Sequence, residues 1–315
     1  MAIHHVEPDV HTLHGHFSRD LAPVLTIESG DTVRYRTLDA GWSVIDNPDP
    51  FERPPKFPDR DKDLHPGHAL CGPIAIQGAK AGMTLEVHLK TIRTGTWGWS
   101  AAGFWHPRSK QLGLPDKIDY MIRWQLDADT GVATTQDGMQ VQLRPFMGVL
   151  GMPPNEAGQH ITDPPRFCGG NIDCKELIVG SRLFLPIAVD DGLFSIGDGH
   201  AVQGDGEVAG PALECPMELV EVDFTLHPSL HLSMPRANTP NGWVAFGFDE
   251  DLDAAMMTAL NGMLDIIEEV YAVDRAKALA LASIAVDLRI SQIVNGVRGV
   301  HAFLPHDAVT INKET

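Results

Sequence analysis

The sequence predicts a mainly β fold, a sandwich or a distorted barrel, with a C-terminal α+β portion that carries two helices. Its 30 Gly and 23 Pro divide the 315 residues into many short elements, because both residue types favour turns. Apolar and polar residues alternate after several of these turns, with the period of a half-buried strand. Beyond residue 250 the apolar spacing changes to three and four residues, which is typical of helices.

Four predicted strands follow turns of one type, in which a Gly shortly precedes the alternating segment. These strands cover residues 33–37, 85–88, 139–143 and 183–186. Their irregular spacing along the chain argues against a solenoid of equal repeats and favours a sandwich or a distorted barrel.

A Pro-rich segment over residues 46–66 interrupts the strand pattern. A segment of this length without a clear period predicts a long excursion on the surface. It is either a solvated loop or a part of the chain that shapes a site or an oligomer contact.

The first predicted helix runs from Leu252 to Val270, and Asp249 or Asp251 can cap the free backbone amides at its start. Asp274 caps a second helix, which the spacing extends through Leu288. Apolar side chains follow one face of each helix, and this arrangement indicates packing against a core.

After the helices the chain returns to an extended segment over residues 293–304, with Asn295-Gly296 as a turn signal. We therefore divide the chain in two. Residues 1–245 form a β-rich core that carries the Gly-rich loops, and residues 246–315 form a helical pair and a returning strand packed on that core.

The charge of the chain excludes whole classes of partner. It has 24 Lys and Arg against 42 Asp and Glu, so the formal net charge is 24 − 42 = −18. Such a protein repels the phosphate backbone of nucleic acids and anionic membrane surfaces. No apolar stretch approaches the length of a membrane span, and the opening MAIHHVEPD lacks the pattern of a secretory signal. We therefore expect a cytoplasmic protein.

The four cysteines, Cys71, Cys168, Cys174 and Cys215, lack the C-x-x-C spacing of a zinc site. In a chain of this size they are too few to form a disulfide scaffold. We interpret them as structural thiols.

The segment from Ser195 to Glu207 concentrates polar chemistry between glycines. In extended chain, residues two apart share a face, so Asp198 pairs with His200 and Asp205 pairs with Glu207. Converging carboxylates raise one another's pKa unless a cation lies among them. Oxygen and imidazole ligands suit Zn²⁺ or a harder divalent ion such as Ca²⁺. The alternative is a Gly-rich hairpin with solvated acids.

Other candidate residues lie outside this segment. Asn171 and Asp173 follow Gly169-Gly170 and share a face, so an amide donor would lie beside a carboxylate; the alternative is an Asx turn. His68 is either a ligand or proton donor, or a structural histidine. Asp39 ends a predicted strand and either points into a cleft or is an exposed terminal acid.

Several motifs together carry a family resemblance. They are Arg166-x-x-Gly169-Gly170-Asn171-x-Asp173, the block from Gly192 to Glu207, Leu213-Glu214-Cys215-Pro216, and the segments 23–40, 72–79 and 287–294. With them the chain resembles the acetamidase/formamidase family over nearly its whole length. The resemblance implies a β-rich amidase that hydrolyses small linear amides, formamide and acetamide, to carboxylate and ammonia. It also implies a homo-oligomer, a dimer or higher. The family includes hydrolases of cyclic amides, so the amide itself stays open.

On this resemblance we form a hypothesis of metal-assisted hydrolysis. Asp39, Asp173, Asp198 and His200 would surround a divalent metal, with Zn²⁺ as the first candidate and Ca²⁺ as the alternative. The metal would polarise the amide carbonyl and activate a water molecule.

Three further residues receive catalytic roles in this hypothesis. Glu207 would carry the proton from water to the leaving nitrogen, Asn171 would donate to the developing oxyanion, and His68 would be a reserve proton donor or ligand.

Two other functions remain open from the sequence. In a cysteine-nucleophile amidase, Cys71 or Cys168 would attack the amide, although a net charge of −18 disfavours a thiolate. In a non-catalytic β-sandwich module, the Gly-rich loops and acids would bind a small ligand or Ca²⁺ without chemistry.

Overall fold

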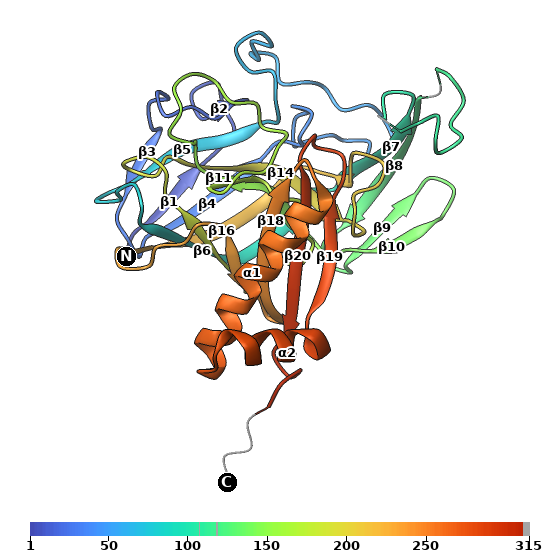
Figure 1. The fold of residues 1–315 in the computed structure, drawn as a ribbon. Coiled ribbons are helices and arrows are strands. Elements are labelled where there is room, and N and C mark those ends of the chain that lie inside the picture. The colour runs from blue at the N-terminus through green and yellow to red at the C-terminus, as the bar shows by residue number, and fades with distance from the viewer. Residues whose placement is uncertain (107, 118, 311–315) are drawn as a thin grey trace.

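Two β-sheets packed against each other form most of the protein, as the computed structural model shows (Figure 1). The structure describes residues 1–106, 108–117 and 119–310. About 40% of the chain is in strands and 10% in helices, and the sheets do not close into a barrel. The predicted mainly β class, with two helices near the C-terminus, is therefore confirmed.

The first sheet has nine strands, which are antiparallel apart from the pair β1 and β4. In spatial order they are β1 (Ile3–Val6), β4 (Thr32–Thr37), β16 (Met217–His227), β6 (Thr84–Thr94), β13 (Arg182–Pro186), β17 (Arg236–Asn238), β18 (Gly242–Asp249), β20 (Arg298–Pro305) and β19 (Asp287–Gln292).

The second sheet has eleven strands and branches at β14 (Phe194–Val202). β11 (Phe146–Gly151) pairs along one edge of β14, whereas β5 (Leu70–Ile76) and β15 (Leu213–Glu214) share the other edge. β14 is therefore covered on both edges. The remaining strands are β10 (Gln140–Gln142), β9 (Val132–Thr135), β8 (Asp119–Asp127), β7 (Trp97–Gly103), β12 (Gly169–Asn171), β2 (Leu13–His14) and β3 (Leu25–Ile27).

The main hydrophobic core lies between the two sheets. Phe194 of β14 and Phe224 of β16 meet there edge to face, with ring centroids 5.0 Å apart. The alternating pattern of β4 buries Val33 and Tyr35 in the same core. Burial thus determines which side chains of each sheet face the core. In β14 it also determines which side chains lie on the opposite face.

The four predicted strands all exist. Residues 33–37 lie in β4, residues 85–88 in β6 and residues 183–186 in β13, while β10 is shorter than the predicted 139–143. The Pro-rich segment over residues 46–66 contains none of the named strands or helices.

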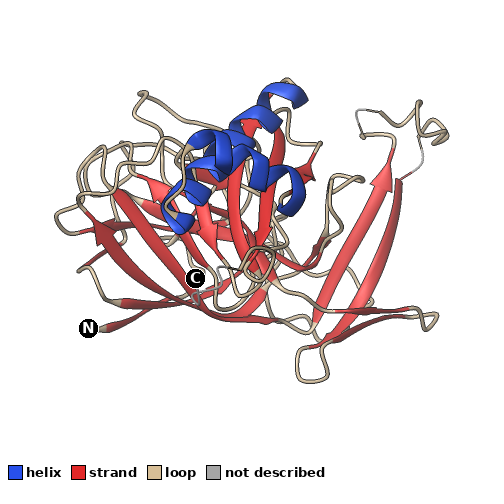
Figure 2. Ribbon diagram, turned by 60° about the horizontal axis from the view of Figure 1, so that its bottom comes forward, coloured by secondary structure: helices blue, strands red, loops and turns tan. Residues whose placement is uncertain are grey.

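The predicted helices are also present. Helix α1 (Leu252–Tyr271) begins at Asp251, whose carboxylate accepts hydrogen bonds from the backbone amides of Asp253 and Ala254. Helix α2 (Arg275–Ala285) begins at Asp274 as expected. Figure 2 shows both helices covering one part of the sheets, and α1 packs on β18 and β20 around a second apolar cluster.

The predicted extension of the second helix through Leu288 is wrong. Helix α2 ends at Ala285, Val286 is already extended, and Leu288 lies in β19 paired with Ala302 of β20. Arg289 shows why the strand is preferred: its guanidinium lies 4.5 Å from the Phe303 ring centroid and binds Glu176. These tertiary contacts outweigh the helical spacing.

The division at residue 245 stays a prediction, although β18 crosses it as a continuous strand of the nine-stranded sheet. Neither α1 nor α2 is both long and apolar enough to cross a membrane, and the described part of the chain forms no other helix.

Gly247 tests the packing of α1 on the sheet. A Cβ at this position in β18 would lie 2.0 Å from the backbone oxygen of Ala255 in α1. We therefore expect Gly247→Ala to lower the free energy of unfolding by about 1–3 kcal/mol, the usual cost of overpacking. Chemical denaturation measures this loss.

Gly262→Ala is the matched control, because it adds the same methyl group from the helix side. Its Cβ would meet only the Ala245 side chain, at 3.3 Å, and Ala is favoured over Gly inside a helix. Equal destabilisation by both variants would contradict this account of the packing.

Candidate functional site

Two adjacent strands place the first polar side chains of the site. Asp198 and His200 lie two residues apart on β14 and are both buried, on the same face as predicted. Glu214 of β15 stands opposite His200 in the strand register. The His200 Nε2 atom is 3.2 Å from an Asp198 oxygen and 3.3 Å from a Glu214 oxygen.

Asp173 joins this cluster from the segment after β12. Its Oδ1 atom lies 3.9 Å from His200 Nδ1, while its Oδ2 atom accepts a hydrogen bond of 2.6 Å from the Asn295 side chain. The Gln203 amide donates to the Asp173 backbone oxygen at 2.9 Å. Asn295 therefore holds one carboxylate oxygen of Asp173, while the other oxygen is directed at the cluster.

Gly148 of β11 provides the space that the cluster occupies. A Cβ on this residue would lie 2.3 Å from Asp198 Oδ2, 2.7 Å from Asp173 Oδ1 and 2.9 Å from the His200 ring. Any side chain at this position would displace at least one of the polar groups, so the strand must carry Gly here.

Glu207 reaches the cluster from the Gly-rich loop after β14. Its backbone has φ 45°, and Asp173 and Asp198 also have left-handed backbones, with φ 50° and 58°. Such conformations are uncommon for residues other than Gly and gather at functional sites. Three of the acids in the cluster thus share this strained geometry.

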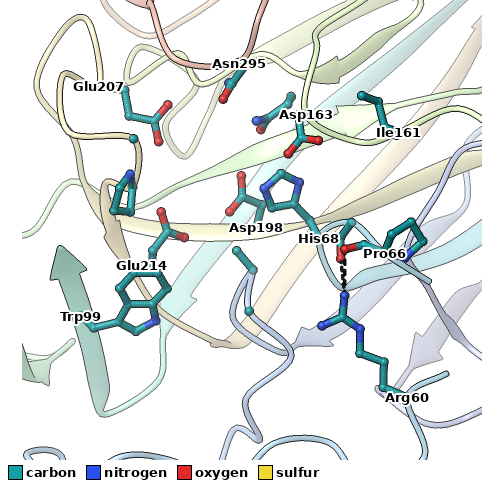
Figure 3. Close-up of a pocket in the computed structure, with 16 residues that line it drawn as sticks. Arg60, Pro66, His68, Trp99, Ile161, Asp163, Asp198, Glu207, Glu214 and Asn295 are labelled. Atoms are coloured by element: carbon teal, nitrogen blue, oxygen red, sulfur yellow. Dashed lines mark hydrogen bonds between the residues drawn. The ribbon is translucent and has the colours of Figure 1, made fainter. Parts of the chain in front are cut away.

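A pocket of about 430 Å³ opens over the cluster. Figure 3 shows Asp198, Glu207 and Glu214 directed into one space, and all three line the pocket. Asn171, which is buried, and His68 line it as well. The structure thus brings six of the seven residues singled out from the sequence to one site, in the cluster or in the pocket wall: Asp173, Asp198, His200, Glu207, Asn171 and His68.

Burial dominates the electrostatics of the cluster. It raises the pKa of Asp173 to about 6 and that of Glu214 to about 7, and it raises the pKa of Glu207 well above its usual range. Burial alone would lower the pKa of His200, but the charges of Glu214 and Asp198 outweigh it and raise that pKa. His200 in turn lowers the pKa of Asp198 despite its burial.

The donor atoms fit a divalent cation. Ligand atoms of Asp173, Asp198 and His200 lie within 4.8 Å of one another, and so do those of His200, Glu207 and Glu214. Among the described residues, one oxygen each of Asp173, Glu207 and Glu214 is buried without a hydrogen-bond partner. Carboxylate oxygens and one imidazole are ligands that Zn²⁺ and Ca²⁺ accept, in different proportions.

Asp39 lies outside both of these groups of ligands. It is fully buried, and its oxygens accept hydrogen bonds from Ser43 and from Trp99 Nε1, the latter at 2.8 Å. Asp39 therefore supports the pocket wall through Trp99, and its role as a ligand stays a prediction.

The expected pairing of Asp205 with Glu207 is wrong. Asp205 forms an ion pair of 2.9 Å with Lys175 and is partly exposed, whereas Glu207 is buried in the cluster. Residues two apart share a face only in extended chain, and the left-handed backbone of Gly206 and Glu207 turns the chain between them.

The two thiols considered as nucleophiles do not face the pocket. Cys71 and Cys168 are buried, and each points at a backbone carbonyl oxygen, that of Arg36 and that of Met152 respectively. Burial raises the pKa of each thiol to about 12, so neither provides a thiolate at neutral pH.

Sequence reasoning missed Glu214, Asn295 and Gly148. Glu214 lies within the motif Leu213-Glu214-Cys215-Pro216, but the sequence predicts no role for it, because only the register of β15 on β14 brings it to His200. The sequence predicts only a turn at Asn295. Its turn is held by the Gln292 side chain, which accepts from the Val294 and Asn295 amides, and this places the Asn295 amide on Asp173.

Comparison with known proteins identifies the family. The sequence model of the acetamidase/formamidase family matches residues 3–160 and 156–310. The chain belongs to the acetamidase/formamidase family. The resemblance predicted from its motifs is confirmed.

Curated relatives share about a quarter of their aligned residues with this chain. A formamidase from Methylophilus methylotrophus is 27% identical over 248 residues, which are 62% of this chain and 59% of that protein. An acetamidase from Mycolicibacterium smegmatis is 27% identical over 252 residues, 62% of this chain and 61% of that protein. The matched region thus spans about three-fifths of these relatives.

Solved structures show the same fold. Acetamidases from Bacillus halodurans and Yersinia enterocolitica each superpose with a TM-score of 0.82 at 24% identity. The matches cover 96% and 98% of this chain and 97% and 93% of those chains. A gamma lactamase from Delftia acidovorans matches 96% of this chain and 91% of its own, with a TM-score of 0.60 at 21% identity.

Gly148→Ala tests whether the space at the cluster is needed for a cation. The added methyl group overlaps Asp198 and Asp173, so we expect bound divalent metal, measured by elemental analysis, to fall well below that of the wild type. Circular dichroism should show an unchanged strand content. Full metal content in the variant would contradict the assignment of this cluster.

Proposed function

We propose that this protein hydrolyses small linear amides, with formamide and acetamide as the first candidates, to a carboxylate and ammonia. One observation carries the proposal: a buried cluster of acids and one imidazole forms the floor of a pocket in a member of this family. The names of its curated relatives, formamidase and acetamidase, agree with it. Homo-oligomeric assembly and a cytoplasmic location stay predictions.

We place a divalent cation among Asp173, Asp198, His200 and Glu214, with Zn²⁺ favoured by the imidazole and Ca²⁺ as the alternative. When bound, such an ion would polarise the amide carbonyl and make water more acidic. Glu214 joins this proposed ligand set through its contact with His200, and the role of Asp39 as a ligand stays a prediction.

Glu207 is proposed as the group that moves the proton. Attack by water forms a C–O bond and moves the carbonyl electron pair to oxygen, and the water must lose a proton in that step. Glu207 lines the pocket, and burial beside Asp173 raises its pKa well above the usual range, so it accepts a proton more readily than an exposed carboxylate does. It then delivers the proton to nitrogen as the C–N bond breaks and the C=O bond forms again.

Asn171 is proposed to stabilise the oxyanion that this attack creates. Its side chain is buried in the pocket wall, where water competes little for its hydrogen bonds. A preorganised donor of this kind typically contributes about 3 kcal/mol to stabilising the transition state.

Removal of the metal separates the enzyme from the other candidate functions. We expect ammonia release from formamide or acetamide to stop after exhaustive chelation and to return when Zn²⁺ or Ca²⁺ is added back. A cysteine-nucleophile enzyme would keep its activity without metal. A metal-replete protein that releases no ammonia from any small amide would instead support the ligand-binding module.

Glu207→Gln separates proton transfer from metal binding. The amide keeps the shape of the side chain but cannot accept the proton, so we expect kcat to fall by roughly 10²- to 10⁴-fold. Elemental analysis should find the metal retained. Loss of metal together with activity would make Glu207 a ligand instead of the base.

Asp205→Asn is the matched control for this variant. It makes the same chemical change two residues earlier in the loop, at a carboxylate that binds Lys175 outside the cluster. We expect its kcat to stay close to that of the wild type.

A further inference from the structure

We propose that Thr162 fixes the tautomer of His68, so that His68 presents an Nε2–H donor to the pocket and is not a metal ligand. Thr162 is a positioning residue in this proposal. The tautomer follows from geometry alone, and its use in amide hydrolysis rests on the function proposed above.

The Thr162 hydroxyl contacts His68 twice. Its oxygen accepts a hydrogen bond of 3.0 Å from the His68 backbone amide and lies 2.7 Å from the ring atom Nδ1. Thr162 is fully buried, and the described residues offer its hydroxyl proton no acceptor other than Nδ1.

Only one assignment of protons satisfies all of these groups. If the hydroxyl donates to Nδ1, the backbone amide, the hydroxyl and the ring nitrogen all have partners, and the ring proton must lie on Nε2. If Nδ1 carried the proton, the hydroxyl oxygen would accept twice and its own proton would be buried without an acceptor. Such an unsatisfied group is costly, so the first assignment is preferred.

The segment before His68 is held so that this contact persists. A Cβ on Gly67 would lie 2.2 Å from the Thr162 oxygen, so this position must be Gly for the hydroxyl to approach. The Gly67 carbonyl accepts from Trp42 Nε1 at 2.8 Å, and its amide donates to Gly15 at 3.0 Å. Arg60 binds the carbonyl oxygens of His65, Pro66 and Gly67.

Thr162 is held equally well on its own side. Phe17 and His160 exchange two backbone hydrogen bonds of 2.9 and 2.8 Å just before it. The Arg166 guanidinium binds the backbone oxygen of Ile161 at 2.9 Å. Both partners of the Thr162–His68 contact therefore have a fixed backbone.

The His68 ring faces the pocket in which we expect the substrate to bind. Figure 3 shows the His68 ring directed into the pocket between Asp163 and Asp198. A nitrogen that carries a proton cannot ligate a metal, but it can donate to a carbonyl oxygen or an oxyanion. His68 would thus act beside Asn171 as a neutral donor to the oxygen of the amide.

Nitrogen NMR of the metal-loaded protein tests the tautomer directly. In protein labelled with ¹⁵N-histidine, long-range proton–nitrogen correlations distinguish a protonated ring nitrogen from a bare one, and His68→Gln assigns the signals. We expect a bare Nδ1 and a protonated Nε2 in the wild type and in Thr162→Ser. In Thr162→Val, which is similar in shape but has no hydroxyl, we expect a mixture of tautomers.

Kinetic measurements on the same variants test whether the Nε2–H tautomer of His68 contributes to catalysis. Thr162→Val should lower kcat about tenfold with a smaller change in KM, and Thr162→Ser should restore it, because only Ser keeps the hydroxyl. A protonated Nδ1 in the wild type, or a Thr162→Val spectrum identical to that of the wild type, would overturn the proposal. The wild-type spectrum tests the proposed tautomer even if Thr162→Val does not fold.

The two proposals fail in different ways. If the wild type shows the expected tautomer but releases no ammonia, the assignment of His68 stands and the amidase function fails. If ammonia is released and Nδ1 carries the proton, the amidase function stands and the role of Thr162 is wrong.

Discussion

Mutual repulsion of buried carboxylates is the constraint that governs this structure. Asp173, Asp198, Glu207 and Glu214 are each no more than 6% exposed and surround His200. One imidazolium offers a single positive charge, and its Nε2 proton can be donated to only one of the two acids beside it. A fold that gathers these groups must hold them against their repulsion, and the divalent cation proposed for this site would offset part of that cost.

Strands and loops that are distant in the sequence hold these acids and His200 in place. β14 supplies two groups, β15 supplies Glu214, and Gly148 of β11 leaves the space. The turn between β19 and β20 adds a third side: Asn295 holds Asp173, and the backbone of Ile293 binds Gly206 in the loop that carries Glu207. The turn between the C-terminal strands therefore completes the site, while β20 itself packs against α1.

The sequence predicts most of what depends on local periodicity. Alternation located four strands, spacing and acidic caps located both helices, and the two-residue rule placed Asp198 beside His200. It could not predict what depends on strand register or on loop backbone. The position of Glu214 depends on the pairing of β15 with β14. Asp205 lies outside the cluster because the backbone between it and Glu207 is left-handed. Strand pairing also explains the wrong prediction at Leu288: the residue pairs with Ala302 of β20 and so lies in a strand, not in the second helix.

The negative charge of the pocket would affect release of the product more than binding of the substrate. A small amide is neutral, so an acidic wall neither attracts nor repels it strongly, and entry depends on hydrogen bonding. The carboxylate product of the proposed reaction would be an anion, and both the exposed Asp163 in the pocket wall and the net charge of −18 would repel it. The donors proposed here, Asn171 and the Nε2–H of His68, are neutral, so they would bind the reacting oxygen without adding a further positive charge to that of the proposed cation.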